Sequence, residues 1–143
     1  PESVGRSVEA IAVSNYISPV MLSQATVFEF VNRGLFEPNL ERVIGLLGAR
    51  RDAMLESLEK ELGGSGAAWS HPEGGYFLWL DFPKGSNVDD VLKKAEASGV
   101  TFVKGTDFFP ANGGGTESAR LAYSFVSVDE IRDGVKKLAA CLA

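Results

Sequence analysis

A run of three glycines and a single arginine are the residues of this chain whose types and spacing could do chemistry. They lie in "ANGGGTESARLAYSF", residues 111–125, where Gly113–Gly115 precede a short apolar segment that contains Arg120. A glycine-rich loop can cradle a phosphate, but a P-loop needs a Lys-Ser/Thr pair after the glycines, and a dinucleotide-binding loop must open a helix. Neither requirement is met here. We therefore predict a loop with positive φ angles, which glycine adopts at little steric cost, leading into a strand.

Arg120 could bind an anion, because a guanidinium is a planar fork that pairs with a carboxylate through two hydrogen bonds. Alternate side chains of a strand over residues 119–125 point to opposite faces. One face would hold Ala119, Leu121, Tyr123 and Phe125, and the other Arg120, Ala122 and Ser124. The small neighbours of Arg120 leave space for a ligand. Two other interpretations stay open: an arginine that extends from an edge strand into solvent, or one that pairs with an acidic side chain of its own chain.

The other reactive residue types have simpler interpretations. His71 precedes a proline turn and is expected in a loop, and Cys141 lies near the last helix end, where packing is the expected role. Asp89–Asp90 fall in the first turn of a predicted helix and complement its dipole. Arg50–Arg51 are interpreted as part of a solvated helix face. With one histidine and one cysteine in the chain, no His/Cys metal site is expected.

The composition predicts one soluble, cytoplasmic globular domain. The chain has 143 residues, of which 45% are hydrophobic and 23% charged. A net charge of −5 argues against nucleic acid and anionic membranes as partners, since both need clustered Lys and Arg. No apolar run approaches the roughly 20 residues of a membrane span. A lone cysteine suits a reducing compartment.

The first half of the chain is expected to be entirely helical. Apolar residues at Val4, Val8 and Ile11 have helical spacing. A second helix is predicted with Ser18 as N-cap, Pro19 in its first turn and Gly34 just past its end. This helix is apolar on several sides, which is typical of a buried helix or of a subunit interface, and the pattern does not choose between them.

A long third helix is predicted from about Pro38 to Leu62. Each of Gly45 and Gly48 costs about 1 kcal/mol relative to alanine in a helix interior, so we expect either close packing on them or a bend. A helix of this length would either connect this domain to another one, as a spine helix, or pack against its own domain. The pattern does not choose between these alternatives.

The second half alternates strands and helices. Strands are predicted over Tyr76–Phe82, central in a sheet, from Val100 and from Ala119. Asn87 is the predicted N-cap of one helix, and a Ser127–Glu130 capping box opens the last. The predicted fold class is α+β: a helical N-terminal half with a long spine helix, then a small antiparallel or mixed sheet covered by helices on one face. Three divisions of the chain are expected. Residues 1–36 would form a helical interface segment, 37–64 a long inter-domain helix and 65–143 a small C-terminal α+β domain.

Four segments resemble a known family. They are "NYISPVMLSQATVFEFV" (15–31), "HPEGGYFLWLDFP" (71–83), "SGVTFVKGTDFF" (98–109) and "ARLAYSF" (119–125). In this order and spacing they resemble the C-terminal portion of fold-type I, class I/II, pyridoxal-phosphate-dependent aminotransferases. The branch with the aminoadipate, kynurenine and aromatic amino-acid aminotransferases is the most similar. The resemblance covers essentially the whole chain.

The resemblance implies a role for particular residues. Arg120 matches the arginine that pairs with the substrate α-carboxylate, and Phe77 matches an aromatic residue lining that pocket. Tyr16, Ile17 and Ser18 match a segment that reaches across a dimer interface toward the neighbouring subunit's substrate. The parent enzyme would exchange an amino group between an amino acid and a 2-oxo acid.

The same resemblance implies that part of the site lies elsewhere. The Schiff-base lysine, the aspartate that pairs with the pyridine nitrogen and most phosphate-binding groups are expected upstream of Pro1. None of the seven lysines matches the catalytic position, and Lys104 is expected in a loop. The chain alone is therefore expected to be inactive, to bind no pyridoxal phosphate and to self-associate, as a homodimer or otherwise. Two alternatives are a stand-alone regulatory domain that binds a carboxylate metabolite, and a dimerisation module.

Overall fold

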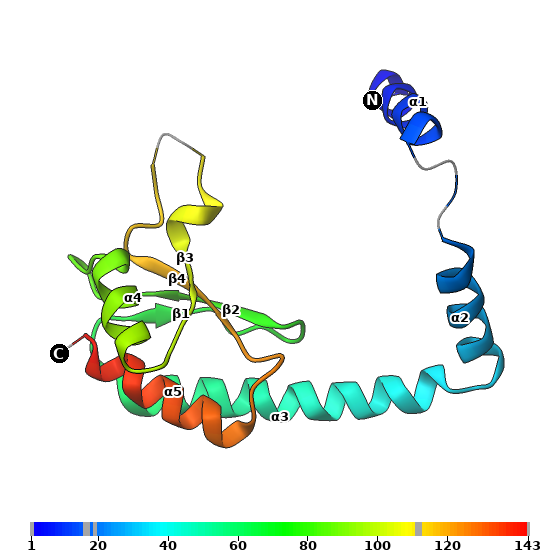
Figure 1. Cartoon of the computed structure of the whole chain (residues 1–143). Coiled ribbons are helices and arrows are strands. Elements are labelled where there is room, and N and C mark those ends of the chain that lie inside the picture. Colours follow the sequence, from blue (N-terminus) through cyan, green and yellow to red (C-terminus); the bar gives the residue numbers. More distant parts are fainter. Residues whose placement is uncertain (1, 16–17, 19, 111–112, 143) are drawn as a thin grey trace. The chain divides into compact units, whose positions relative to one another are not determined.

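The computed structural model describes residues 2–15, 18, 20–110 and 113–142. The chain divides into two compact units, Pro1–Arg42 and Val43–Ala143. Figure 1 shows the course of the chain through the helices and strands of both. The candidate site lies in the second unit.

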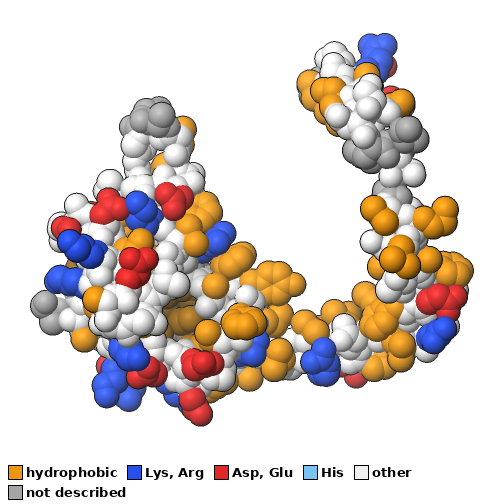
Figure 2. Space-filling model, viewed as in Figure 1, with side chains coloured by type: hydrophobic (Ala, Val, Ile, Leu, Met, Phe, Trp, Pro, Cys, Tyr) orange, Lys and Arg blue, Asp and Glu red, His pale blue; other side chains and the backbone are white. Residues whose placement is uncertain are grey.

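The first unit consists of helices that leave their apolar side chains exposed. They are α1 (Glu2–Asn15), α2 (Met21–Asn32) and the start of α3 (Phe36–Leu62). No described residue of α1 or α2 is buried, and Figure 2 shows hydrophobic side chains along these helices. The N-cap prediction for α2 is wrong: the cap is Val20, without a side-chain bond, because Ser18 lies too far ahead of the first helical N–H groups. The predicted end is confirmed, since Gly34 has φ +66°.

Helix α3 begins two residues earlier than predicted, and Pro38 falls in its first turn, where proline is tolerated. Its buried residues all come from the C-terminal half: Ala53, Met54, Ser57, Leu58 and Leu62. Nothing lies within 4 Å of where a Cβ on Gly45 or Gly48 would be, so no described residue packs closely on these glycines.

The second unit contains a four-stranded antiparallel sheet. Its strands β1 (Ala68–Trp69), β2 (Phe77–Asp81), β3 (Val103–Lys104) and β4 (Ser118–Ala122) have the spatial order β1-β2-β4-β3. The antiparallel alternative and the central position of β2 are thus confirmed. The short strand β1 was not predicted, and the strand expected from Val100 begins only at Val103. Phe125 is 93% exposed instead of sharing the face of Leu121, because β4 ends at Ala122 and the alternation stops there.

Helices cover one face of the sheet, as the α+β prediction requires. Leu78, Leu80, Ala119, Leu121 and Tyr123 are buried on this face against α3, α4 (Val88–Ala97) and α5 (Val128–Ala140). Figure 1 shows α3 and α5 on the same side of the strands. The predicted caps are confirmed: the Asn87 side chain accepts hydrogen bonds from backbone N–H groups of α4, and Ser127 and Glu130 form the capping box of α5. No helix in the described part of the chain is long and apolar enough to cross a membrane.

Candidate functional site

Arg120 lies on the sheet face that the helices do not cover. It is directly opposite Trp79 of β2 on one side and Val103 of β3 on the other. Its neighbours Ala119 and Leu121 point into the core, so alternation directs Arg120 away from it. The edge-strand interpretation is therefore wrong, because β4 is an interior strand.

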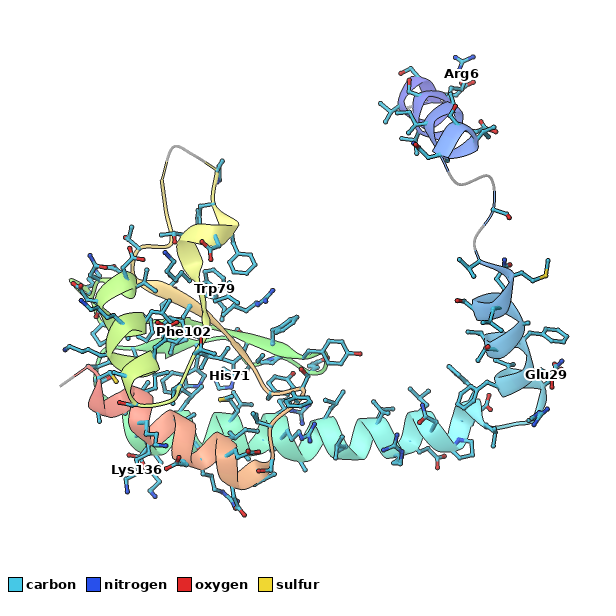
Figure 3. The ribbon with its side chains drawn as sticks, in the orientation of Figure 1. Arg6, Glu29, His71, Trp79, Phe102 and Lys136 are labelled. Atoms are coloured by element: carbon cyan, nitrogen blue, oxygen red, sulfur yellow. The ribbon has the colours of Figure 1, made fainter. Side chains whose placement is uncertain are left out.

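Two phenylalanine rings lie against the Arg120 guanidinium. The guanidinium carbon is 4.0 Å from the centre of the Phe77 ring and 4.9 Å from that of Phe108. Phe77 is the first residue of β2, and Phe108 ends a short 3-10 helix, η1 (Gly105–Phe108), that the sequence did not predict. The Trp79 and Phe108 rings pack edge to face, with their centres 5.5 Å apart. Figure 3 shows Trp79 beside η1. A cation held over aromatic faces keeps its N–H donors available for a ligand.

No acidic side chain of the described residues forms an ion pair with Arg120, so the internal-pairing interpretation has no support there. The Arg120 Nε is buried and lacks a hydrogen-bond partner. Asp81, which shares this sheet face, already accepts hydrogen bonds from Trp79 Nε1 at 3.0 Å and Ser118 Oγ at 2.7 Å. The site therefore presents a cation without a counter-ion among the described residues, in aromatic surroundings that suit a planar anion.

The glycine run supports η1. Gly113, Gly114 and Gly115 have φ angles of +97°, +134° and +71°, which confirms the predicted loop. A Cβ on Gly114 would lie 2.3 Å from the Phe109 ring, and one on Gly115 would lie 2.4 Å from the Gly105 backbone. Glycine is needed here because the loop lies directly on η1 and on Phe109. The loop thus packs against the segment that carries Phe108.

The interpretation of Arg50–Arg51 as a solvated face is wrong. Arg50 Nη1 donates a hydrogen bond to the Ser124 carbonyl, and Arg51 Nη1 donates one to the Glu73 carbonyl at 2.8 Å. No pattern in the sequence indicated these bonds, because each acceptor is a backbone carbonyl on a distant loop.

The remaining candidates stay outside the site. His71 is exposed in a loop, and Cys141 is buried, with its Sγ donating to the Lys137 carbonyl. Ser18 is exposed in the first unit, whereas Tyr16 and Ile17 lie outside the described residues. Within the described ranges no three His, Cys, Asp or Glu side chains gather as metal ligands.

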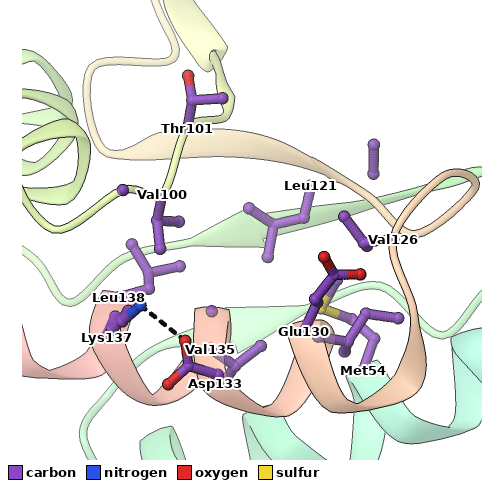
Figure 4. Close-up of a pocket in the computed structure, with 14 residues that line it drawn as sticks. Met54, Val100, Thr101, Leu121, Val126, Glu130, Asp133, Val135, Lys137 and Leu138 are labelled. Carbon is purple, nitrogen blue, oxygen red and sulfur yellow. Dashed lines mark ion pairs between the residues drawn. The ribbon is translucent and has the colours of Figure 1, made fainter.

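A cavity of about 420 Å³ lies between α5, the α4–β3 connection and β4 (Figure 4). Met54, Ile131 and Leu138 are among its lining residues, and Glu130, Asp133 and Lys137 add charge. These residues belong to the helices that cover the sheet, whereas Arg120 is on the opposite face. The cavity is thus separate from the arginine site.

The comparison with protein families decides the family. The model of the aspartate amino-transferase family matches residues 9–143. The chain belongs to the aspartate amino-transferase family. Enzymes of this family are pyridoxal-phosphate-dependent aminotransferases, and the recognition from sequence segments is confirmed.

Three relatives show how much of an aminotransferase the chain represents. The aromatic-amino-acid aminotransferase 1 of Thermococcus litoralis is 38% identical over 117 residues, which are 82% of this chain and 28% of that protein. The crystal structure of α-aminoadipate aminotransferase from Thermus thermophilus, complexed with N-(5'-phosphopyridoxyl)-L-leucine, has a TM-score of 0.83 and 34% identity, covering 99% of this chain and 36% of that one. An uncharacterized HTH-type transcriptional regulator of Bacillus subtilis is 30% identical over 139 residues, 97% of this chain and 28% of that protein. The chain thus spans about a third of the length of such relatives.

The described residues do not fit a pyridoxal phosphate site of an aminotransferase, which needs a lysine beside the substrate. The expectation that Lys104 lies in a loop is wrong, because it lies in β3 and is paired with Ala119 of β4. It is the one lysine in a described strand, and it pairs with Asp89 of α4 at 2.6 Å instead of sharing the Arg120 face. This partner raises the pKa of Lys104, which keeps its ammonium charged. The other lysines lie on α3, α4, α5 and in the turn after β2. Among the described residues, none of the lysines therefore lies beside Arg120 on its sheet face.

Proposed function

We propose that this chain supplies the substrate α-carboxylate-binding arginine, Arg120, of an enzyme that exchanges an amino group between an amino acid and a 2-oxo acid. The observation that carries the proposal is the Arg120 environment: two rings against the guanidinium, a buried Nε without a partner and no acidic side chain paired with it in the described part of the chain. Family membership supplies the reaction class.

Arg120 would bind the carboxylate through its terminal N–H groups. The Nε is buried, so the Nη groups are the donors that a planar ligand reaches. A charge-assisted pair of hydrogen bonds fixes both position and orientation of a carboxylate. Phe77 would line the pocket, as the resemblance implies.

Two further parts of the proposal concern the whole enzyme. Tyr16, Ile17 and Ser18 would approach the substrate of a neighbouring subunit, which makes a homodimer the working assembly. The lysine that holds pyridoxal phosphate would belong to a segment outside this chain. The chain alone would then bind a carboxylate but would not transaminate.

Calorimetric titration of the 143-residue protein tests the proposal. L-phenylalanine should bind, and L-phenylalaninamide, which lacks the carboxylate, should not. Arg120→Ala should abolish binding and Arg120→Lys should weaken it, because an ammonium lacks the planar fork. Arg132→Ala, an exposed arginine on α5, is the matched control. Equal binding by the Arg120→Ala protein would contradict the assignment.

Incubation with pyridoxal phosphate tests the assignment of the lysine. After borohydride reduction, mass spectrometry should find no site-specific cofactor adduct on any of the chain's own lysines. A stoichiometric adduct on one lysine, together with transaminase activity, would show that the chain carries the chemistry itself.

A second candidate function is a regulatory domain that senses a carboxylate metabolite. The Bacillus subtilis transcriptional regulator, which aligns with nearly the whole chain, favours it. Both functions require amino-acid binding by Arg120. They differ in the longer protein: an enzyme transfers the amino group of an amino acid to a 2-oxo acid when pyridoxal phosphate is added, whereas a sensor binds without turnover.

A further inference from the structure

Two consecutive arginines of α3 hold the two loops that flank the Phe77 end of the sheet. Arg51 Nη1 donates to the Glu73 carbonyl at 2.8 Å, in the loop that enters β2. Arg50 Nη1 donates to the Ser124 carbonyl, in the segment that leaves β4. Each bond is charge-assisted, because the donor is a guanidinium.

Asp52 orients the Arg51 guanidinium. Its Oδ1 accepts from Arg51 Nε at 2.8 Å and from Nη2 at 2.7 Å. Two donors of the fork are thereby fixed, and Nη1 is left to reach Glu73. The Arg51 side chain is 27% exposed, which is low for an arginine on a helix surface.

Tyr123 joins the same two loops from inside the core. Its backbone N–H donates to the Tyr76 carbonyl at 3.0 Å, and its hydroxyl donates to the Gly74 carbonyl at 3.2 Å. Tyr123 is fully buried, and burial raises the pKa of its phenol, which stays protonated as a donor. Arg50, Arg51 and Tyr123 together therefore satisfy carbonyls on both loops.

The loop before β2 needs such anchors. It contains Gly74 and Gly75, and Gly75 has φ +86°. Glycine gives a chain many accessible conformations, so the loop would not hold one position unaided. Phe77 follows directly and is 41% exposed, so core packing does not fix its ring. Its position over Arg120 depends on how the loop and strand end are held.

We propose that Arg50 and Arg51 are positioning residues for the Arg120 site: by holding the loops at the end of β2 and β4, they set the Phe77 ring against the guanidinium. This inference deepens the proposed function and rests on it wherever ligand affinity is the readout. The geometry of the ring and the guanidinium can be tested without a ligand.

Side-chain NMR of the ligand-free protein measures that geometry. The Nε–Hε resonance of Arg120 carries a ring-current shift, and Phe77→Leu gives the value when the ring is absent. Arg50→Met and Arg51→Met retain the aliphatic stem but lose the donors. We expect both variants to move the Arg120 resonance toward the Phe77→Leu value, while the methyl resonances of Leu78 and Leu80 stay in place. Arg132→Met, on α5, should change nothing.

Ligand affinity is the second readout. The dissociation constant for L-phenylalanine should rise in each methionine variant by no more than in Phe77→Leu, roughly two- to fivefold, because the two arginines act through the position of that ring. Arg51→Lys should recover part of the loss, because an ammonium can still donate to the Glu73 carbonyl.

The outcomes separate the two proposals. If Arg120→Ala abolishes L-phenylalanine binding while Arg50→Met and Arg51→Met leave both the affinity and the Arg120 resonance unchanged, the positioning role is overturned and the proposed function stands. If the wild type binds no L-phenylalanine but the resonance moves as expected, the proposed function fails and the positioning of Arg120 is supported.

Discussion

The Arg120 guanidinium carbon lies 4.0 Å from the centre of the Phe77 ring, and the two residues meet diagonally across neighbouring strands. Phe77 is directly opposite Ala122, two residues along β4 from Arg120. Diagonal neighbours on one sheet face are within reach of an aromatic side chain. Strand alternation places Phe77 and Arg120 on the same sheet face, and the Phe77 ring contacts the guanidinium there. This contact leaves the hydrogen-bond donors of Arg120 unused.

Phe77→Leu should weaken carboxylate binding by roughly two- to fivefold, because a cation over an aromatic face contributes about 0.5–1 kcal/mol at an exposed site. Leucine keeps the apolar character but has no ring face. Calorimetry with L-phenylalanine measures the change, and Phe125→Leu, at a residue that is 93% exposed, is the control. Unchanged affinity in Phe77→Leu would mean that the ring contact does not prepare Arg120 for a ligand.

Phe108→Leu should have a similar effect on affinity and should also change tryptophan fluorescence. Phe108 contacts both Arg120 and Trp79, so its removal leaves the indole more accessible to water. We expect a red shift of the emission, which Trp79→Phe should remove and Trp69→Phe should not. If Phe108→Leu still causes a red shift in a protein that lacks Trp79, the shift does not come from Trp79, and the expected effect of the Phe108–Trp79 contact is contradicted.

Much of this fold could be predicted because its signals are local. Asn87, Ser127 and Glu130 cap helices through bonds within a few residues, and positive φ angles at Gly34 and Gly113–Gly115 follow from glycine itself. The predictions that failed depend on where an element stops. Strand alternation placed Phe125 on the same face as Leu121, yet pairing of β4 ends at Ala122, and nothing local marks that end.

The candidate site divides in the same way. Arg120 could be found from alternation along its own strand, and Phe77 from the family resemblance. Phe108 could not, because it reaches Arg120 from a 3-10 helix whose position depends on the glycine loop. The anchoring by Arg50 and Arg51 was also missed, since backbone carbonyls of remote loops leave no mark in the sequence.

Gly115→Ala should destabilise the protein by about 1–3 kcal/mol, the usual cost of a non-glycine residue in a left-handed conformation. Its φ is +71°, and the new Cβ would lie 2.4 Å from the Gly105 backbone. Gly134→Ala is the matched control: nothing lies within 4 Å of a Cβ at this α5 position. Alanine there should stabilise by up to about 1 kcal/mol through helix propensity. Urea unfolding measures both, and equal effects of the two substitutions would contradict the packing of the loop on η1.

Glu130→Gln should reduce the loss of stability in acid. The Ser127 backbone N–H and hydroxyl each donate to the Glu130 carboxylate at 2.7 Å and hold its pKa below the ordinary 4.5. A carboxyl group with a lowered folded pKa contributes stability that is present above pH 4.5 and is lost as the pH falls through that lower value. Urea midpoints between pH 6 and pH 3 should therefore fall less in Glu130→Gln than in the wild type. Glu96→Gln, which makes the same change at an exposed position of α4, is the control.

Val27→Asp and Phe28→Asp should each reduce self-association of the isolated chain. Both side chains lie on α2 and are 62% and 63% exposed, and exposed apolar surface of this kind drives association in water. A charge on that surface would have to be desolvated in any contact between copies. Sedimentation velocity should show concentration-dependent association of the wild type and a smaller fraction of oligomer in each variant. Thr26→Asp introduces the same charge at a neighbouring polar position of α2 and is the control. A wild type that stays monomeric at every concentration would show that these apolar residues do not associate with a second copy.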